Sequence, residues 1–537
     1  RPPISTLFPY TTLFRSAADF NIIEKMLTAR LLYGNNLEGS RRTTYIPSDV
    51  YFDQMYKSRG NLSYGNRQAQ TMEATVAFNK EFGTFMTMDA VAGIGYYYND
   101  GNGMNVSYDG QHDAIRNDDI GSSTGVRTPA SYRYSDEKRS QFARAHFDFL
   151  DRYVLAVTLR RDGTDKFFPD KKYALFPSVS LAWKITNENF MKDVEIFDLL
   201  KLRASYGETG SDNLGTTLYG TYGPYGNQIM FNNNAVKYIP IILNGLDYPD
   251  VSWQKTTMEN IGIDFSVLKN RFWGSFDVYR NDITDMLGTA NTAGLSMFGT
   301  YPINGAHMRR QGWDATLNSK NIQTGNFTWV TILTLTRYNS LWIERMPNYD
   351  YNTYEKRPPV ESSLQYYYET RGIINADMSN MPASQPAAAR KPGYPIIVDQ
   401  NNDGEITIDD IKTRNLVPSI YFGFGNTFTY KNFDLDVFMY SQLGIYKYNY
   451  ARDWASATEL ANQNSNSNKF IYDLWNSQTN PNGTMPGIAW NLATVSLPGG
   501  AGTDMGYQDA SFLRIRNITL GYNLTKNQLG QLGTYLN

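Results

Sequence analysis

Apolar and polar residues alternate along many short stretches of this chain, and this period of two constrains the fold more than any other feature of the sequence. In residues 260–267 every second residue is apolar, and residues 272–279 continue the pattern. Leu268, Lys269 and Asn270 separate the two stretches. A tight turn there would join them into an antiparallel hairpin with one apolar face and one polar face.

The same alternation predicts eleven further strands. They cover residues 71–79, 85–98, 143–149, 153–159, 174–184, 200–208, 310–319, 326–338, 422–428, 433–439 and 510–524. In the last of these, the apolar residues change phase at Arg516 and Asn517. That change predicts a β-bulge, with an error in the assumed register as the alternative.

The links between the predicted strands alternate between short and long. Short links fall near residues 80–84, 150–152, 185–199, 268–270, 320–325 and 430–432, and long links near residues 99–138, 162–173, 209–255, 282–309, 339–417 and 444–509. Successive links of a meander lie at opposite ends of the sheet, so one end would carry only short turns. Outer-membrane barrels have this asymmetry, with short periplasmic turns and long extracellular loops. We therefore predict an all-β fold, an antiparallel transmembrane β-barrel in the bacterial outer membrane.

Composition agrees with this prediction. No apolar run approaches the roughly 18 residues of a membrane-spanning helix, so any crossing would use strands of a closed barrel. Aromatic residues make up 14% of the chain, including 40 Tyr, and such rings gather where barrels meet the water–lipid boundary. A large soluble β-protein is the alternative. A net charge of −2 predicts no binding to nucleic acid.

The first residues have an unusual origin. The segment Thr6–Ser16, TLFPYTTLFRS, matches the translation of a sequencing-adapter oligonucleotide. We therefore interpret residues 1–16 as an adapter artefact and residues 17–537 as a partial barrel. Its long extracellular loops are expected near residues 99–138, 209–255, 339–417 and 444–509.

Several segments resemble one family in the same order. They are RDGTDKF at Arg161–Phe167, WQKTTMENIGIDF at Trp253–Phe265, NGAHMRRQGWDATL at Asn304–Leu317, the acidic loop at Asp399–Asp410 and DASFLRIRNITLGYNL at Asp509–Leu524. Together they are similar to the SusC/RagA family of TonB-dependent outer-membrane transporters, over most of residues 70–524. His307 stands where the family usually has an acidic residue, so that position is given no role.

The resemblance implies a 22-stranded barrel, of which this chain would be an incomplete part. The plug domain and the segment that contacts TonB would lie upstream of residue 1, and further strands would follow Asn537. The resemblance also implies a SusD-like surface lipoprotein as partner, outer-membrane lipid around the barrel, and TonB-dependent import of oligosaccharides or peptides. A siderophore or metal-chelate receptor is the alternative within the membrane.

One loop has the spacing of a calcium site. Asp399, Asn401, Asp403 and Glu405 place oxygen atoms at every second position, and Gly404 permits a sharp turn. Asp410 stands where a calcium loop would have a longer, bidentate glutamate. The loop is therefore a candidate Ca²⁺ or Mg²⁺ site, and a turn closed by its own side chains is the alternative. No cofactor is otherwise required.

Aromatic residues in the long links are candidates for substrate binding. Tyr366, Tyr367 and Tyr368 stand in a row, and Trp454 lies in a later link. Aromatic faces can stack on the apolar surface of sugar rings, although packing between loops would explain the same residues. No nucleotide, nucleophile-elbow or zinc-protease motif is present, and we expect no enzyme. A secreted β-protein that binds or degrades polysaccharide is the alternative outside the membrane class.

Overall fold

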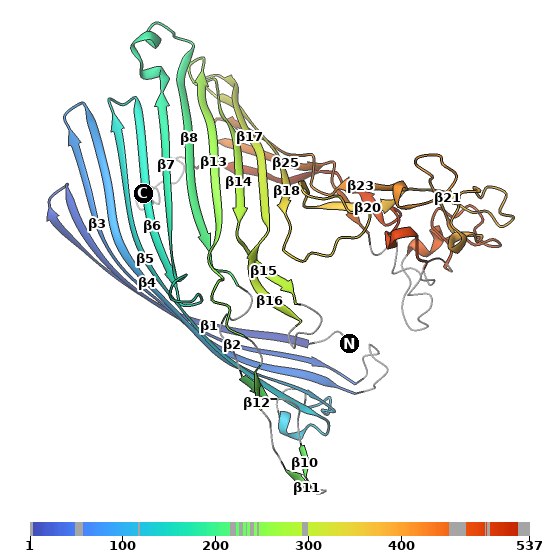
Figure 1. Cartoon of the computed structure of the whole chain (residues 1–537). Coiled ribbons are helices and arrows are strands. Elements are labelled where there is room, and N and C mark those ends of the chain that lie inside the picture. Colours follow the sequence, from blue (N-terminus) through green and yellow to red (C-terminus); the bar gives the residue numbers. More distant parts are fainter. Residues whose placement is uncertain are drawn as a thin grey trace. The chain divides into compact units, whose positions relative to one another are not determined.

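The computed structural model contains a 16-stranded antiparallel sheet as its main element (Figure 1). The structure describes residues 4–48, 57–115, 119–214, 218, 222–224, 229–231, 234–236, 241–243, 246–292, 299–449, 469–488, 490 and 495–524. Along the sheet the strands are β1 (Ile4–Ile23), β2 (Leu27–Ile46), β3 (Arg59–Phe82), β4 (Met86–Asp109), β5 (Arg127–Phe149), β6 (Tyr153–Thr164), β7 (Tyr173–Lys184), β8 (Phe197–Ser211), β13 (Gln254–Val267), β14 (Phe272–Thr284), β17 (His307–Gln323), β18 (Phe327–Glu344), β24 (Ile420–Tyr430), β25 (Phe433–Leu443) and β28 (Phe512–Tyr522), while β19 (Val360–Glu361) pairs with β18. Strands that are successive in this order are neighbours in the sheet.

Short strand pairs lie in the links of the main sheet. They are β9 (Tyr222–Pro224) with β12 (Ile241–Leu243), β10 (Ile229–Phe231) with β11 (Asn234–Val236), β15 (Met286–Asn291) with β16 (Thr300–Gly305), β20 (Leu364–Tyr368) with β23 (Ile411–Asn415), β21 (Thr370–Ile373) with β22 (Pro395–Ile397), and β26 (Tyr446–Tyr448) with β27 (Tyr507–Asp509). Most helical segments are three-residue 3₁₀ turns, such as η2 (Ile185–Asn187) and η3 (Asn189–Met191), while η6 (Lys469–Asp473) has five residues. No helix among the described residues has the length and apolar character needed to cross a membrane.

All thirteen strands predicted from the alternation are confirmed. The turn between β13 and β14 is tight, since Leu268, Lys269 and Asn270 all adopt positive φ angles between 56° and 60°. The β-bulge is also confirmed. Phe438 of β25 pairs with Asn517 and Met439 pairs with Ile515, which leaves Arg516 as the extra residue of β28.

Two long strands of the main sheet, β1 and β2, were not predicted, and neither were β19 and the short strand pairs in the links. Strands β1 and β2 pair in antiparallel register from Ile4 to Ile23, so residues 4–16, which we interpreted as an adapter artefact, form part of β1. Their pairing does not test their origin, which stays a prediction.

The alternation of link lengths holds with one exception. The links at 83–85, 150–152, 268–271, 324–326 and 431–432 are short, and those at 110–126, 212–253, 285–306, 345–419 and 444–511 are long. The link at 165–172 was expected to be long, but it is shorter than the supposedly short link at 185–196. The latter folds into η2 and η3, which makes it compact.

Strands β4 and β5 extend well into the segment that was expected to be a long loop. They leave only residues 110–126 as a link, not residues 99–138. The extension includes Gly101 and Gly103, which favour turns in isolation. Here the rings of Tyr134 and Tyr132 on β5 lie against these two glycines and cover the exposed backbone. The two rings stack with their centroids 6.3 Å apart.

The chain divides into two compact units. Unit 1 contains residues 1–182, 205–257 and 285–304, and unit 2 contains residues 183–204, 258–284 and 305–537. The hydrophobic cores are small and local. In unit 1, a cluster around Phe167, Phe176 and Trp253 is buried. In unit 2, two clusters lie within the long links, around Tyr368 and Ile397 and around Ile374 and Tyr394.

Candidate functional site: the two faces of the sheet and the long-link segments

The strand register of unit 1 separates the side chains into two chemically different faces. Ala29, Val76, Ala92, Ala143 and Leu159 lie directly opposite one another on β2 to β6, so they share one face. Side chains one position away point to the other face because successive residues of a strand alternate. The first face is apolar, and we call it the apolar face.

The other face carries polar and charged groups. Asp89 and His146 are partners on β4 and β5, with 3.8 Å between a carboxylate oxygen and Nδ1. On β6, Arg160 pairs with Asp162 at 2.7 Å. His146 therefore lies on the polar face and contacts a carboxylate there.

Large apolar residues are widely exposed in both units. On the apolar face of unit 1, Ile94 is 60% exposed, and within unit 2, Ile261 is 68% and Leu520 is 72% exposed. A protein in water rarely leaves a continuous apolar surface of this size uncovered. Lipid is the solvent that matches such a face, whereas the polar face matches a water-filled lumen.

The apolar band of β4 has the height of a membrane. The apolar-face residues of β4 run from Met86 to Tyr96, a span of ten residues. At ~3.3 Å per residue and a strand tilt of ~40°, this span is about 25 Å tall. Aromatic rings mark both margins, with Tyr33 and Tyr96 at one end and Phe149 at the other. The aromatic content noted in the sequence is thus placed where a barrel needs it.

Ion pairs cross the polar face of unit 2. The Arg203 guanidinium donates to both carboxylate oxygens of Asp264 at 3.0 Å and to Asp277 at 2.8 and 2.9 Å. Lys201 lies 3.4 Å from Asp264. The three strands β8, β13 and β14 are thereby joined through one guanidinium, whose planar geometry suits two carboxylates at once.

His307 belongs to another cluster. Its Nε2 atom lies 2.6 Å from Asp282, which also accepts hydrogen bonds from Arg280 at 2.6 Å and Arg309 at 2.8 Å. Asp282 of β14 and Arg309 of β17 stand directly opposite each other in the strand register. No local sequence pattern predicts this cluster, because the link at 285–306 separates its members on β14 from those on β17.

The row of tyrosines is mostly buried within the long link at 345–419. Tyr368 is 0% and Tyr367 is 6% exposed, while Tyr366 is half-buried. The Tyr368 hydroxyl lies 2.9 Å from the carbonyl oxygens of both Thr407 and Pro498, which share its single hydrogen. Burial raises the pKa of Tyr368 to about 12, and the charge of Asp410 adds to this effect. Of the three rings, only that of Tyr366 retains an exposed part, and Trp454 lies outside the described residues.

The loop at 399–410 is closed by its own side chains. The Asp399 carboxylate accepts from the backbone N–H groups of Asn402 at 2.7 Å and Gly404 at 2.9 Å. Asp403 accepts from the N–H of Glu405 at 2.9 Å, and Asn401 accepts from the N–H of Asp403 at 3.0 Å.

The buried carboxylate of Asp410 accepts from the N–H groups of Gln400 at 2.7 Å and Thr407 at 2.8 Å. Within the described part of the chain, no three acidic or histidine side chains are grouped as metal ligands would be. The hydrogen bonds are those of the alternative reading, a turn held by its own side chains.

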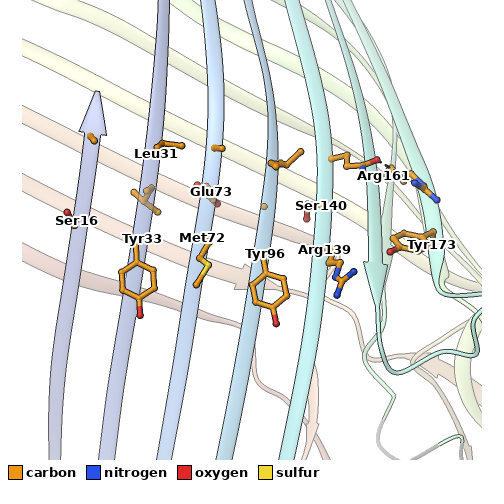
Figure 2. A pocket seen from close by; sticks show the side chains of 16 residues that line it. Ser16, Leu31, Tyr33, Met72, Glu73, Tyr96, Arg139, Ser140, Arg161 and Tyr173 are labelled. Carbon is orange, nitrogen blue, oxygen red and sulfur yellow. Dashed lines mark hydrogen bonds between the residues drawn. The ribbon is translucent and has the colours of Figure 1, made fainter. Parts of the chain in front are cut away.

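A hollow of about 640 Å³ opens in the apolar face of unit 1 (Figure 2). Ala74, Leu31 and Ile94 contribute to its lining, together with Met72 and the rings of Tyr33 and Tyr96. Figure 2 shows Arg139, Arg161 and Tyr173 at one side of the hollow. No motif of the sequence predicts this hollow. A signal was present, because the apolar phase of β6 ends at Arg161.

These features define a class of protein. Antiparallel strands with an exposed apolar face, a polar opposite face and a band about 25 Å tall form the wall of a membrane β-barrel.

Sequence comparison identifies the family. Residues 8–396 match the family described as TonB dependent receptor-like, beta-barrel, and the chain belongs to it. It is therefore an outer-membrane protein, as predicted.

Known relatives agree with the assignment. The chain is 25% identical to TonB-dependent receptor P3 of Formosa agariphila over 94% of this chain and 50% of that protein. It is 28% identical to TonB-dependent receptor SusC of Bacteroides thetaiotaomicron over 75% of this chain and 40% of that protein. The structure of the RagAB peptide transporter shares the fold, with a TM-score of 0.76, 18% identity, and coverage of 98% of this chain and 57% of that chain. The chain thus spans about half the length of the relatives that it matches.

Proposed function

We propose that the complete protein imports oligosaccharides or peptides across the outer membrane, driven by TonB and assisted by a SusD-like surface lipoprotein. The observation that supports this most strongly is the two-faced wall, with an exposed apolar band and a polar opposite face crossed by ion pairs. In this proposal the chain moves its ligand and does not convert it. The RagAB structure is that of a peptide transporter, which supports the peptide class of ligand.

The long links provide the outer part of the proposed route. The segment between β18 and β24 shares its buried cores at Tyr368 and Tyr394 with residues of the later long link, including Leu497 and Trp490. Link segments that pack on a shared core keep a defined surface. Such a surface is suited to a protein partner, so we assign the contact with the lipoprotein to the segment at 345–419.

Tyr366 is the ring that we propose for ligand contact in this segment. It packs at 5.5 Å against Tyr354, and its hydroxyl accepts from the backbone N–H of Lys356 at 2.8 Å. These contacts fix the ring while part of it stays exposed, which limits the entropy that a ligand must remove on binding. Replacing Tyr366 with Ala should raise the half-saturation concentration for uptake, whereas replacing the buried Tyr367 should act through folding of the segment.

The test is uptake by cells that carry the full-length gene together with the adjacent lipoprotein gene. A panel of labelled oligosaccharides, peptides and a ferric siderophore is supplied to cells with and without functional TonB. We expect uptake of an oligosaccharide or peptide that requires TonB. TonB-independent uptake, or uptake of the siderophore alone, would overturn the proposal.

The partner is tested in the same strain. The segment 364–415 is replaced by a short linker, which preserves β18 and β24, and folding of the barrel is checked by heat-modifiable migration in gels. We expect the lipoprotein to stop co-purifying with the folded barrel. Co-purification at the wild-type level would place the partner contact elsewhere.

A further inference from the structure

The hollow of Figure 2 has the chemistry of a lipid site. We propose that it binds the phosphate-bearing lipid of the outer leaflet, lipid A, with the phosphate on Arg161 and an acyl chain along the apolar face. This inference concerns the outside of the wall, so it stands independently of the ligand that the barrel imports.

The position of the hollow fits the outer leaflet. Tyr96 and Tyr33 lie at the margin of the apolar band that faces the long link at 110–126. Long links are extracellular in outer-membrane barrels. The hollow therefore lies where the headgroups of the outer leaflet meet their acyl chains, and those headgroups carry phosphate.

The apolar part of the hollow continues toward the middle of the band. A second hollow of about 650 Å³ shares Leu31, Ala74, Ile94 and Arg161 with the first, and it is also lined by Val76, Ala92, Ala143 and Leu159. The floor of the second hollow is formed by the small side chains of Ala74, Ala92 and Ala143, which are surrounded by larger side chains. The two hollows together form a groove on the apolar face, which begins at the Arg161 guanidinium and continues over the alanine side chains. This arrangement matches a lipid with an anionic headgroup and an acyl chain.

The charge at the margin is available for a ligand. The Arg161 guanidinium lies 4.2 Å from the centroid of the Tyr173 ring, and its one described hydrogen bond is a 3.5 Å contact with Gln141. No described carboxylate forms an ion pair with Arg161. Arg139 lies nearby but is paired with Glu137 at 2.6 Å. A guanidinium has five N–H donors in a planar array, which suits the oxygens of a phosphate.

Stacking on Tyr173 also fixes the orientation of the Arg161 side chain. A cation over a ring face keeps the N–H groups at its edge free for other acceptors. A second copy of the chain would need a surface that both fills the hollow and neutralises Arg161. Lipid A, which is present in the outer leaflet, supplies an acyl chain for the hollow and a phosphate for Arg161. We therefore assign the site to lipid.

Site-specific photo-crosslinking tests the proposal. Leu31, which lines both hollows, is replaced by a photoreactive phenylalanine in the full-length transporter, purified with its partner and reconstituted with lipid A of known phosphorylation. Adducts are identified by mass spectrometry. We expect an adduct with lipid A. Its yield should fall about tenfold when Arg161→Gln is added, which is the size expected for loss of a hydrogen-bonded charge. The yield should fall by a similar factor when dephosphorylated lipid A is used.

Two further variants complete the test: a control that removes a guanidinium outside the site, and a change to the apolar part of the site. Arg144→Gln removes a guanidinium from the opposite face of β5, where it partners Thr158 in the register, and should leave the adduct unchanged. Ala74→Leu should reduce the adduct by filling the floor without altering charge. Heat-modifiable migration shows that each variant is folded. An adduct insensitive to Arg161→Gln and to phosphate, or an adduct to a second copy of the chain, would overturn the proposal.

Discussion

An arginine placed on the apolar face should destabilise the barrel far more than an arginine on the next residue. Val157 of β6 is 42% exposed on the apolar face, four residues from Tyr153 at the margin. Four residues cover ~13 Å along a strand and about 10 Å of height at a ~40° tilt, so Val157 lies near the middle of a band about 25 Å tall. At that depth an arginine costs about 2–4 kcal/mol.

The matched control is Thr158→Arg. Thr158 follows Val157 and partners Arg144, so its side chain points to the polar face. An arginine there remains in water but stands opposite Arg144, so we expect repulsion to cost no more than about 1 kcal/mol.

The free energy of unfolding is measured by urea titration of the full-length protein in lipid vesicles, with heat-modifiable migration as the readout. If the two variants lost equal stability, the assignment of the apolar face to lipid would be refuted. If Thr158→Arg were the more damaging variant, the two faces would have to be exchanged.

Three further predictions concern the segment at 345–419. Tyr368→Phe removes the hydroxyl donor shared by the carbonyl oxygens of Thr407 and Pro498, and Thr407 keeps only the bond from the Asp410 N–H, so we expect a local loss of about 1–3 kcal/mol and faster proteolytic cleavage of the segment. The loop closed by Asp410 should keep its proteolytic resistance in EDTA, and protection that requires Ca²⁺ would instead establish the metal site. The hydrogen bond from Lys412 lowers the pKa of the Glu369 carboxyl, and that from Gln400 adds to it. A lowered folded pKa gives stability that is present at neutral pH and lost as pH falls below about 4.5. Because both side chains are well exposed, the loss should stay below about 1 kcal/mol, and it should vanish in Glu369→Gln when resistance is compared between pH 7 and pH 3.5.

The sequence predicted the strands that cross the membrane because lipid and water act on alternate residues there. On β6, Leu155, Val157 and Leu159 repeat on one face while Thr158 faces the other. Because lipid contacts one face of the strand and water the other, apolar and polar residues alternate along the sequence with a period of two. The same physics identified the bulge at Arg516, where one extra residue shifts the apolar phase.

Beyond the apolar band, this signal disappears. Residues 99–109 of β4 and 127–138 of β5 project past the margin at Tyr96, where both faces meet water. The chain there contains Gly and Asn, and its strands are held by the pairing with their neighbours, not by a local pattern. The prediction from alternation therefore ended β4 and β5 too early, and the expected loop at 99–138 was longer than the observed link at 110–126.

The tyrosine row shows a similar limit for the candidate site. Adjacent residues of a strand point in opposite directions, so Tyr367 on β20 had to face away from Tyr366 and Tyr368. Three neighbouring rings could not form one platform. Which rings are covered depends on Thr407 and Pro498, which are distant in sequence, and no local pattern reports such contacts.

The end of the apolar phase is itself informative. On β6 the apolar stripe passes from Leu159 to Arg161, and on β14 it passes from Val278 to Arg280. Each strand reaches its first charged residue on the apolar face where the lipid must end, because a charge inside the band costs several kcal/mol. The same positions hold side chains long enough to reach headgroups while their stems stay in the apolar layer. One criterion therefore locates both the membrane boundary and the candidate lipid contacts: the first charged residue of a strand whose side chain lies on the apolar face.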